Sequence, residues 1–312
     1  MKAKVIGAIV AAMFLAGWMA GTVRADTITR TITHGSTTIN MDFVTVDNAG
    51  NTADDTTYGA VGYAYIIGKY EVTAAQWAAV IAAAPVVGNA GYWTGSQPTA
   101  GASWNEAAKF CNWLTTGSAT SGYYTITDGA ASTNALSHDA YAAANGTTYF
   151  IPTEDEWYKA AYHKNNGVTG GGANYWDYPT GSDSVPSNDV TSPDGGNNAN
   201  FYQGGYTIGA PNYLTTVGEF ENSDSPYGTF DQGGNVFEWN ETIVSGVTGS
   251  GRGLRGGCYD NLDGDLASSA RDYGIPFNGN HIIGFRVASV PEPTSLGLLT
   301  LGGLALLKRR RR

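Results

Sequence analysis

Glycine is the residue that most restricts how this chain can fold, because 43 of its 312 residues are glycine. That is about twice the usual share of roughly 7%, and glycine weakens the interior of helices and strands. The glycines gather with Asn, Ser and Thr at 115–148, 165–200 and 245–253, which we expect to be loops. Hydrophobic residues still make up 42% of the chain, enough to build a core. We therefore predict one α+β domain with much irregular backbone.

The charges of the chain are unevenly distributed. Eight of its 17 Lys and Arg residues lie before residue 26 or after residue 290, which leaves 9 basic and 26 acidic side chains in residues 26–290. A body this acidic repels the phosphate backbone of nucleic acids, whose binding needs clustered Lys and Arg. The sequence therefore argues against a nucleic acid as partner.

Both ends of the chain have the composition of targeting segments. Residues 1–25 combine a basic start, an apolar run and a small-residue exit, the three parts of a secretory signal peptide. An anchor that stays attached is the alternative. At the other end, Pro291-Glu292-Pro293 precedes an uncharged run at 296–307 and then Lys308 and four arginines. Twelve helical residues reach about 18 Å, less than the roughly 30 Å hydrocarbon core of a bilayer.

The C-terminal segment resembles the PEP-CTERM sorting signal of exported bacterial proteins. That resemblance implies passage through the secretion machinery, a transient inner-membrane anchor, and removal of the tail by an exosortase-type protease. We therefore expect a signal peptide at 1–25, one domain at 26–290 and a sorting segment at 291–312. The mature protein is expected at the cell surface or outside the cell, with the membrane a partner only through the unprocessed sorting segment.

Three helices are predicted where a capping residue precedes apolar residues spaced three and four apart. Their first turns are capped by Thr73, by Ser103 with Glu106, and by Thr153 with Glu156. Short strands are predicted at 61–67, at 282–289 and after the Gly233-Gly234 turn.

The usual catalytic motifs are missing from the sequence. No two of the four histidines have a spacing that would place them on one helix face, and neither a Gly-x-Ser-x-Gly elbow nor a phosphate-binding loop occurs. Cys111 and Cys258 are the only cysteines, so they could form a disulfide in an oxidising compartment. Cys111 falls on the apolar face of its helix, which favours a buried, apolar role.

The segment from Asp231 to Glu238 is the most specific acidic feature. Its two carboxylates lie on either side of a Gly-Gly turn that frees backbone carbonyl groups, and calcium prefers this mixture of oxygen ligands. A turn with solvated acids is the alternative.

Several separated blocks of the chain resemble the formylglycine-generating enzyme, or sulfatase-modifying factor, family. They follow the family's order across residues 41–289: Gly68–Thr73, Ser103–Leu114, Ile151–Trp157, Tyr227–Trp239, Leu254–Gly257, Arg271 and Gly284–Arg286. The resemblance implies a variant of the C-type lectin-like fold that is stabilised by calcium. It places calcium ligands at the side chains of Asp231 and Glu238 and the carbonyls of Gly234 and Val236, and it begins a second site at Asn200 and Phe201.

The same resemblance bears on catalysis. Active members of the family oxidise a substrate cysteine with O₂ at Cu(I), which two cysteines hold shortly after the Arg-Gly-Gly block. Asn261 and Leu266 stand at those two positions, and neither side chain can bind copper. Cys258 stands where the family usually has Ser. Copper is therefore not expected, and no catalytic residue is assigned.

Two functions remain open. The first is a non-catalytic exported domain that uses a calcium-supported scaffold to bind a glycan or a protein. Its adaptable contact surface would come from Tyr- and Asn-rich loops, including Tyr175, Trp176, Tyr178, Tyr202, Tyr206, Tyr259 and Asn261. The alternative for each of these aromatic residues is that it fills the core of a loop-rich fold. The second is an oxidase that converts a cysteine of exported sulfatases to formylglycine.

The arginines give a structural expectation in either case. Arg255, Arg271 and Arg286 are among the nine basic residues of the body. Arginine can make planar, two-pronged bonds to carboxylates inside a fold. We expect these three to organise the core near the acidic segments rather than to bind a substrate.

Overall fold

The computed structural model describes residues 26–167, 174–245 and 250–291. The signal peptide expected at 1–25 and all but the first residue of the expected sorting segment lie outside these ranges. Within them, no helix is long and apolar enough to cross a membrane.

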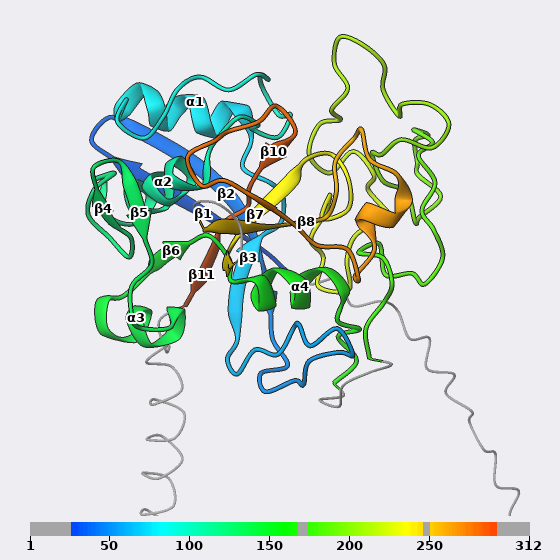
Figure 1. Cartoon of the computed structure of the whole chain (residues 1–312), viewed down its shortest axis with the longest axis horizontal. Coiled ribbons are helices and arrows are strands. Elements are labelled where there is room, and N and C mark those ends of the chain that lie inside the picture. The colour runs from blue at the N-terminus through cyan, green and yellow to red at the C-terminus, as the bar shows by residue number, and fades with distance from the viewer. Residues whose placement is uncertain (1–25, 168–173, 246–249, 292–312) are drawn as a thin grey trace, which may run out of the picture.

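The larger of two main sheets joins the beginning and the end of the domain (Figure 1). Its strand order is β1-β2-β3-β11-β6, and neighbouring strands are antiparallel. The strands are β1 (Thr27–His34), β2 (Thr37–Val46), β3 (Tyr65–Gly68), β11 (Ala288–Val290) and β6 (Thr148–Phe150). Because β11 lies between β3 and β6, the last strand of the domain is an interior strand of the sheet that β1 and β2 begin.

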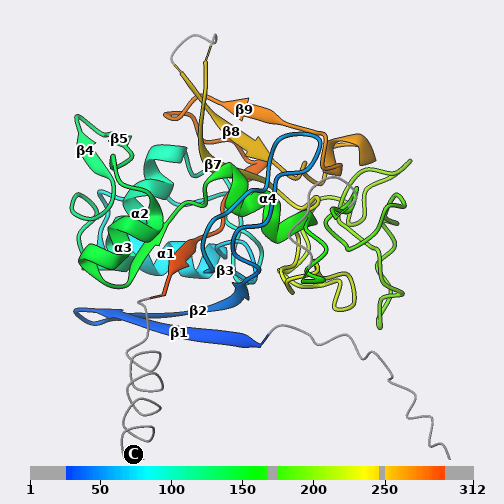
Figure 2. The same cartoon turned by 90° about the horizontal axis from the view of Figure 1, so that it is seen from below.

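The second sheet consists of strands that follow the acidic loop, which is the segment 230–236 that contains Asp231 and leads into β7. Its strand order is β10-β7-β8-β9, with β10 parallel to β7 and the other pairs antiparallel. The strands are β7 (Phe237–Val244), β8 (Gly251–Arg255), β9 (Asp272–Gly274) and β10 (Ile283–Gly284). A short hairpin of β4 (Thr125–Thr127) and β5 (Ala130–Ser132) stands apart from both sheets. In Figure 2 the β1–β2 hairpin and the strands β8 and β9 lie on opposite sides of the molecule.

The three predicted helices begin at their expected caps. They are α1 (Ala74–Ala83), α2 (Trp104–Thr116) and α4 (Glu154–Tyr162), and each starts with a capping box. A further helix, α3 (His138–Asn145), was not predicted. Its N-cap Ser137 makes no side-chain capping bond, and only His138 and Ala142 are buried, so the sequence lacks both the cap and the apolar stripe.

The predicted loops are partly corrected by the structure. Residues 115–148 are not one loop, because they contain the end of α2, the β4–β5 hairpin, α3 and the first residue of β6. Residues 245–253 include the start of β8. Only 165–200 fits the prediction, since its described residues form isolated bridges but neither a helix nor a strand.

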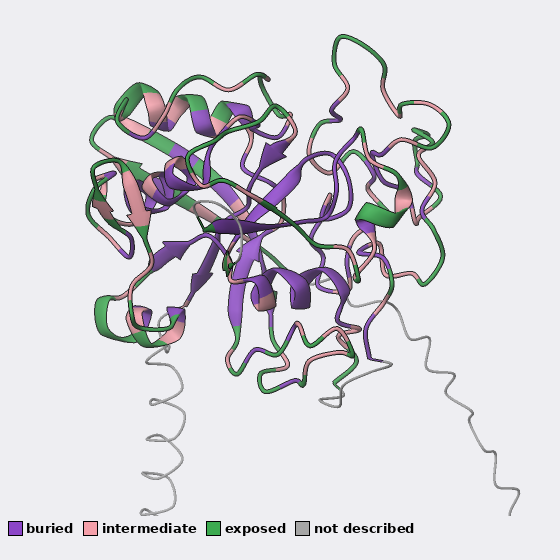
Figure 3. Ribbon diagram, in the orientation of Figure 1, coloured by how far each residue is buried: buried purple, intermediate pink, exposed green. Residues whose placement is uncertain are grey.

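The core follows the strands β3, β6, β8 and β11 together with α4, which are almost wholly buried, whereas long exposed loops surround them (Figure 3). Five tryptophans are among its largest buried side chains: Trp77, Trp104, Trp113, Trp157 and Trp239. The two cysteines do not form the disulfide that the sequence allowed. Cys111 and Cys258 are both buried free thiols.

All three arginines pair with carboxylates as expected. Arg255 Nε donates to Glu154 Oε1 at 2.8 Å, and Arg271 reaches the same carboxylate with two bonds, Nε to Oε1 at 2.7 Å and Nη2 to Oε2 at 2.9 Å. One carboxylate of α4 therefore holds β8 and the segment that leads into β9. The third, Arg286, pairs with Glu238 of β7.

A buried histidine joins three further elements. His138 Nδ1 lies 2.9 Å from Glu156 Oε2 on α4, and its Nε2 lies 3.2 Å from Glu241 Oε2 on β7, the latter without the alignment of a hydrogen bond. Burial by itself would lower the pKa of His138, but the two carboxylates outweigh it and raise that pKa from 6.5 to about 10. An imidazolium therefore links α3, α4 and β7 inside the core.

Replacing Arg271 by Lys should lower the melting temperature. Lysine keeps the positive charge but cannot make the two parallel bonds to Glu154, and we expect a loss of about 1 kcal/mol, or about 2–4 °C in a domain of this size. Thermal unfolding followed by circular dichroism tests this. Lys164→Arg, at the long surface ion pair with Asp183, is the control that should melt like the wild type. An Arg271→Lys protein with an unchanged melting temperature would contradict the role given to Arg271.

The ionised His138 should make folding stability fall as pH rises. The pKa is raised in the folded state, so the contribution of His138 is fully present below pH 6.5 and is lost as pH increases toward about 10. Denaturant unfolding between pH 6.5 and 8 should show a stability slope steeper for the wild type than for His138→Gln, by up to about 1.4 kcal/mol per pH unit. His34→Gln, at a half-buried histidine of the β1–β2 hairpin, serves as the control. Parallel slopes for wild type and His138→Gln would show that His138 is not ionised.

Candidate functional site

The turn before β7 brings the two predicted calcium segments together. Gly234 forms an isolated parallel bridge with Asn200, and the Asn235 amide donates to the Asn200 carbonyl at 2.8 Å. Gly234 has a φ of +83°, and a Cβ there would lie 2.1 Å from the Asn200 carbonyl oxygen. Only glycine fits at this position, because a side chain would push the two segments apart.

Asn200 and Phe201 are deeply buried in the second predicted segment. The Asn200 side-chain amide donates to the carbonyl of Tyr213 at 3.0 Å and to Asn235 Oδ1 at 2.9 Å, while its own Oδ1 has no hydrogen-bond partner. The Phe201 carbonyl accepts bonds from Asn188 and Thr207. Protein donors therefore take up the Phe201 carbonyl, and Asn200 Oδ1 is the acceptor left over.

Glu238 is already neutralised by the protein. Its two carboxylate oxygens accept bonds of 2.6 Å each from Nε and Nη2 of Arg286, and Trp157 Nε1 donates to the same carboxylate at 2.7 Å. Arg286 also donates to the carbonyls of Gly68 and Phe230. A fully buried arginine thus holds Glu238 against the ends of β3 and the acidic loop.

Asp231 and Glu71 are carboxyl groups without such an arginine partner. Asp231 accepts a bond of 2.6 Å from the Gly218 amide, yet burial, with the charge of Glu238 adding to it, raises the pKa of Asp231 to about 6. Neither carboxylate oxygen of the buried Glu71 has a hydrogen-bond partner. Burial, followed by the charge of Asp231, raises the pKa of Glu71 well above its usual range. The surroundings of Asp231 therefore hold more buried carboxylates than cations.

The residues fit a calcium ion at Asp231 better than at Glu238. The two carboxyl groups without an ion pair among the described residues, the half-buried Asp231 and the buried Glu71, are the ones that a bound cation would stabilise. The described part of the chain has no group of three or more His, Cys, Asp or Glu side chains placed to hold a metal. A calcium ion here would therefore depend on backbone carbonyls such as those predicted at Gly234 and Val236. The four-residue ligand set stays a prediction.

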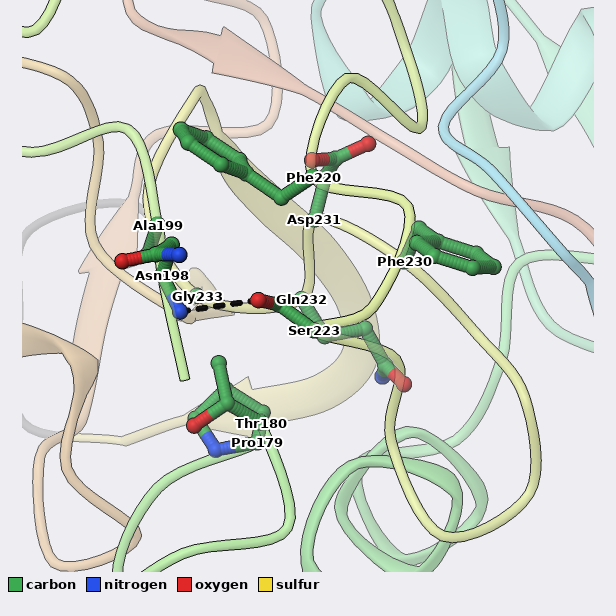
Figure 4. A pocket seen from close by; sticks show the side chains of 10 residues that line it. All are labelled: Pro179, Thr180, Asn198, Ala199, Phe220, Ser223, Phe230, Asp231, Gln232 and Gly233. Atoms are coloured by element: carbon green, nitrogen blue, oxygen red, sulfur yellow. Dashed lines mark hydrogen bonds between the residues drawn. The ribbon is translucent and has the colours of Figure 1, made fainter. Parts of the chain in front are cut away.

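A water-sized cavity of about 10 Å³ lies beside this loop (Figure 4). A hydrogen bond crosses one side of it, in which the backbone N–H of Asn198 donates to Ser223 Oγ at 2.8 Å. The Asp231 carboxylate is turned away from Asn198 and Thr180 (Figure 4). This cavity is too small for an organic ligand and has room for about one water molecule.

The two positions at which the family resemblance places copper ligands, Asn261 and Leu266, make structural contacts. Asn261 Oδ1 accepts bonds of 3.0 Å from both the amide and Sγ of Cys258. Leu266 is fully buried and packs with Tyr178, Ala199 and Phe201. Burial raises the pKa of the Cys258 thiol to about 12, so this cysteine stays protonated at neutral pH.

A much larger hollow of about 420 Å³ opens beside the turn that carries Cys258 and Asn261. Four segments that are distant in the sequence line it, and none of the lining residues belongs to a helix or strand. Five of the eight lining residues are aromatic, and the others are Pro211, Asp260 and His281. The aromatic residues are Tyr92, Trp93, Tyr206, Tyr213 and Tyr259.

The wall of this hollow is tied to the predicted calcium loop. The amide of Tyr259 donates to the Asn235 carbonyl at 3.0 Å. The carbonyl of Tyr213 accepts the bond from the Asn200 side chain described above. The Asn200–Gly234 contact is therefore connected to two aromatic residues of the hollow, Tyr213 and Tyr259, by one hydrogen bond each.

The sequence found only part of this site. Of the loop aromatics expected to form a contact surface, Tyr206 and Tyr259 line the hollow, but Tyr175 and Tyr178 are buried core residues. Sequence reasoning missed Tyr92-Trp93 because the pair lies far from the other lining residues along the chain. An aromatic pair after Gly91, in a stretch with no periodic pattern, was the available signal.

Comparison with known proteins identifies the family. A model of the sulfatase-modifying factor enzyme 1-like domain matches residues 26–290, and a model of the PEP-CTERM protein-sorting motif matches residues 289–312. No curated protein matches the sequence.

Three solved structures are similar to the chain. CarF is 21% identical over 81% of this chain and 99% of its own, with a TM-score of 0.52. PvdO from Pseudomonas aeruginosa is 19% identical over 80% of this chain and 94% of its own, with a TM-score of 0.51. Treponema denticola variable protein 1 is 22% identical over 85% of this chain and 99% of its own, with a TM-score of 0.48.

At these identities the likeness to CarF and PvdO concerns the fold. The expected fold class is confirmed: an α+β, loop-rich variant of the C-type lectin-like fold. The sorting motif implies exosortase-mediated processing of the C-terminal end. The chain therefore belongs to the sulfatase-modifying factor enzyme 1-like family and carries a PEP-CTERM sorting motif.

Proposed function

We propose that this protein is a non-catalytic, exported binding module of the sulfatase-modifying factor family. The observation that carries the proposal is the aromatic hollow beside the turn with Cys258 and Asn261. Its volume lies within the roughly 300–1,000 Å³ of small-molecule sites, and such sites are lined mainly by apolar and aromatic groups with a few polar ones.

The loss of oxidase chemistry is supported by what replaces the copper ligands. A linear two-sulfur site needs two thiolates, and Leu266 instead contributes its side chain to an apolar cluster. Restoring a cysteine there would place a polarisable thiol among Tyr178, Ala199 and Phe201 without a partner at Asn261. Oxidation of a sulfatase cysteine is thus the less supported alternative.

Calcium is part of the proposal as a structural ion. Asp231 would hold it by its carboxylate, with the carbonyls of Gly234 and Val236, in a place where both carboxyl oxygens of the buried Glu71 have no hydrogen-bond partner. The ion would supply the positive charge that this pocket of the core lacks. Because Asn235 holds both Asn200 and Tyr259, such an ion would also steady the wall of the hollow.

The place of action follows from the sorting motif. An exosortase-type protease and the secretion machinery are the proposed processing partners, with the C-terminal segment a transient inner-membrane anchor. The mature domain would then present its hollow at the cell surface or in the extracellular space, to a glycan or a protein ligand.

The purified full chain should not form aldehyde on a Cys-x-Pro-x-Arg peptide supplied with O₂ and Cu(I). Asn261 and Leu266 offer copper no thiolate, so we also expect no stoichiometric copper by elemental analysis. An active member of the family in the same assay provides the positive control. Aldehyde formation with bound copper would overturn the binding-module proposal.

Calcium should raise the melting temperature in a way that depends on Asp231. At about a hundred times its dissociation constant a bound ion adds about 2.7 kcal/mol, which corresponds to a rise of several degrees. Asp231→Asn should abolish this rise yet be no less stable than the wild type in EDTA, because it removes a charge that burial and Glu238 disfavour. Asp189→Asn, at an exposed aspartate, should keep the full calcium effect. Equal calcium effects in all three proteins would remove Asp231 from the site.

A further inference from the structure

Tyr206 is an exposed aromatic ring that the protein holds in one place. It is 43% exposed, but its ring contacts Tyr202 and Tyr213 edge-on, with centroids 5.1 Å apart in each case. Its hydroxyl donates to Asp260 Oδ1 at 2.8 Å. An immobilised ring loses little conformational entropy when a ligand packs on it.

Tyr92 is a second exposed ring with a fixed position on the hollow. It is 66% exposed, and its ring meets His281 edge-on at 6.0 Å. The ring also lies over the backbone of Gly101, where a Cβ would come within 2.7 Å of it. Glycine at 101 therefore makes room for the Tyr92 ring. The hollow thus presents two exposed rings in fixed positions, Tyr92 and Tyr206, from separate segments of the chain.

The charges around the hollow select against acidic ligands. Its lining includes neither Lys nor Arg and contains the carboxylate of Asp260. Residues 26–290 as a whole carry 26 acidic and 9 basic side chains. Phosphorylated, sulfated or uronic-acid ligands would meet repulsion here without the arginine or lysine that recognises such anions.

The backbone around the hollow does not favour an extended peptide that pairs as a strand. All its lining residues come from irregular segments, so no strand edge is available to pair with a peptide backbone. A compact ligand with apolar faces and a rim of hydroxyl groups suits the site better. Its faces can pack on aromatic rings, and its hydroxyls can bond to Asp260, His281 and the tyrosine hydroxyls.

We infer that the hollow binds the end of a neutral oligosaccharide, with Tyr206 and Tyr92 as the rings that contact the sugar faces. This inference rests on the proposed binding function and names its ligand class. Tyr206 provides a preset stacking surface, and Asp260 both holds Tyr206 and accepts hydrogen bonds from sugar hydroxyls through its remaining lone pairs.

Binding can be measured by titration calorimetry and by the change in tryptophan fluorescence, to which Trp93 in the lining of the hollow contributes. The full chain is titrated with neutral maltohexaose, cellohexaose and chitohexaose, with an oligogalacturonide as the acidic sugar, and with a Lys- and Tyr-containing peptide. We expect saturable binding of at least one neutral oligosaccharide and none of the acidic one. Tyr206→Ala should weaken that binding at least about tenfold, or about 1.4 kcal/mol, whereas Tyr206→Phe should retain most of it because the ring remains.

The controls separate binding from folding and the ligand class from the function. Phe277→Ala changes an exposed aromatic outside the hollow and should bind like the wild type. Binding of none of the neutral sugars, or equal binding of the oligogalacturonide, would overturn the inference. Binding of the peptide alone, lost in Tyr206→Ala, would also overturn it but would leave the proposed binding function standing. Aldehyde formation on a sulfatase peptide would remove both.

Discussion

The ion pair between Arg286 and Glu238 is the interaction on which the rest of the structure depends. Arg286 lies between β10 and β11 and pairs with Glu238 of β7, a strand of the second sheet. It also donates hydrogen bonds to the carbonyls of Gly68, at the end of β3, and of Phe230. One buried guanidinium thus joins the end of the first sheet, the acidic loop and the start of the second sheet. Removing one partner of such a pair strands the other charge in the core, which typically costs about 3–5 kcal/mol.

This pair also explains why the acidic loop is electrostatically unusual. Arg286 forms its ion pair with Glu238. Asp231 and Glu71 lie in the same region and have no ion pair of their own among the described residues. In a low-dielectric core, such groups either bind a proton or bind a cation. The fold therefore creates a need for positive charge at the turn before β7, and the turn also supports one wall of the aromatic hollow.

The sequence predicted the features that depend on local contacts. Thr73, Ser103 and Thr153 cap their helices because a capping box involves residues only three apart. The arginine pairs were predictable in kind, since buried arginine needs a carboxylate, although the sequence could not say that Arg255 and Arg271 share Glu154. Two features were not predictable: α3, which has no apolar stripe, and the hollow, whose lining residues Tyr92 and Tyr259 lie far apart in the sequence. The β1–β2 hairpin was missed although residues 27–46 alternate between apolar and polar side chains on both sides of Gly35.

Asn261 and Leu266, the two positions at which the family resemblance places copper ligands, are connected to the hollow by direct contacts. Asn261 holds the Cys258 turn with its side chain and receives the Tyr202 amide on its carbonyl, and Tyr202 in turn contacts the ring of Tyr206. Leu266 closes the other end of the same turn by packing against Phe201, the neighbour of Tyr202. Both side chains therefore help to fix the loop that carries Tyr202 and Tyr206. An aromatic wall held in this way loses little conformational entropy if a ligand packs on it.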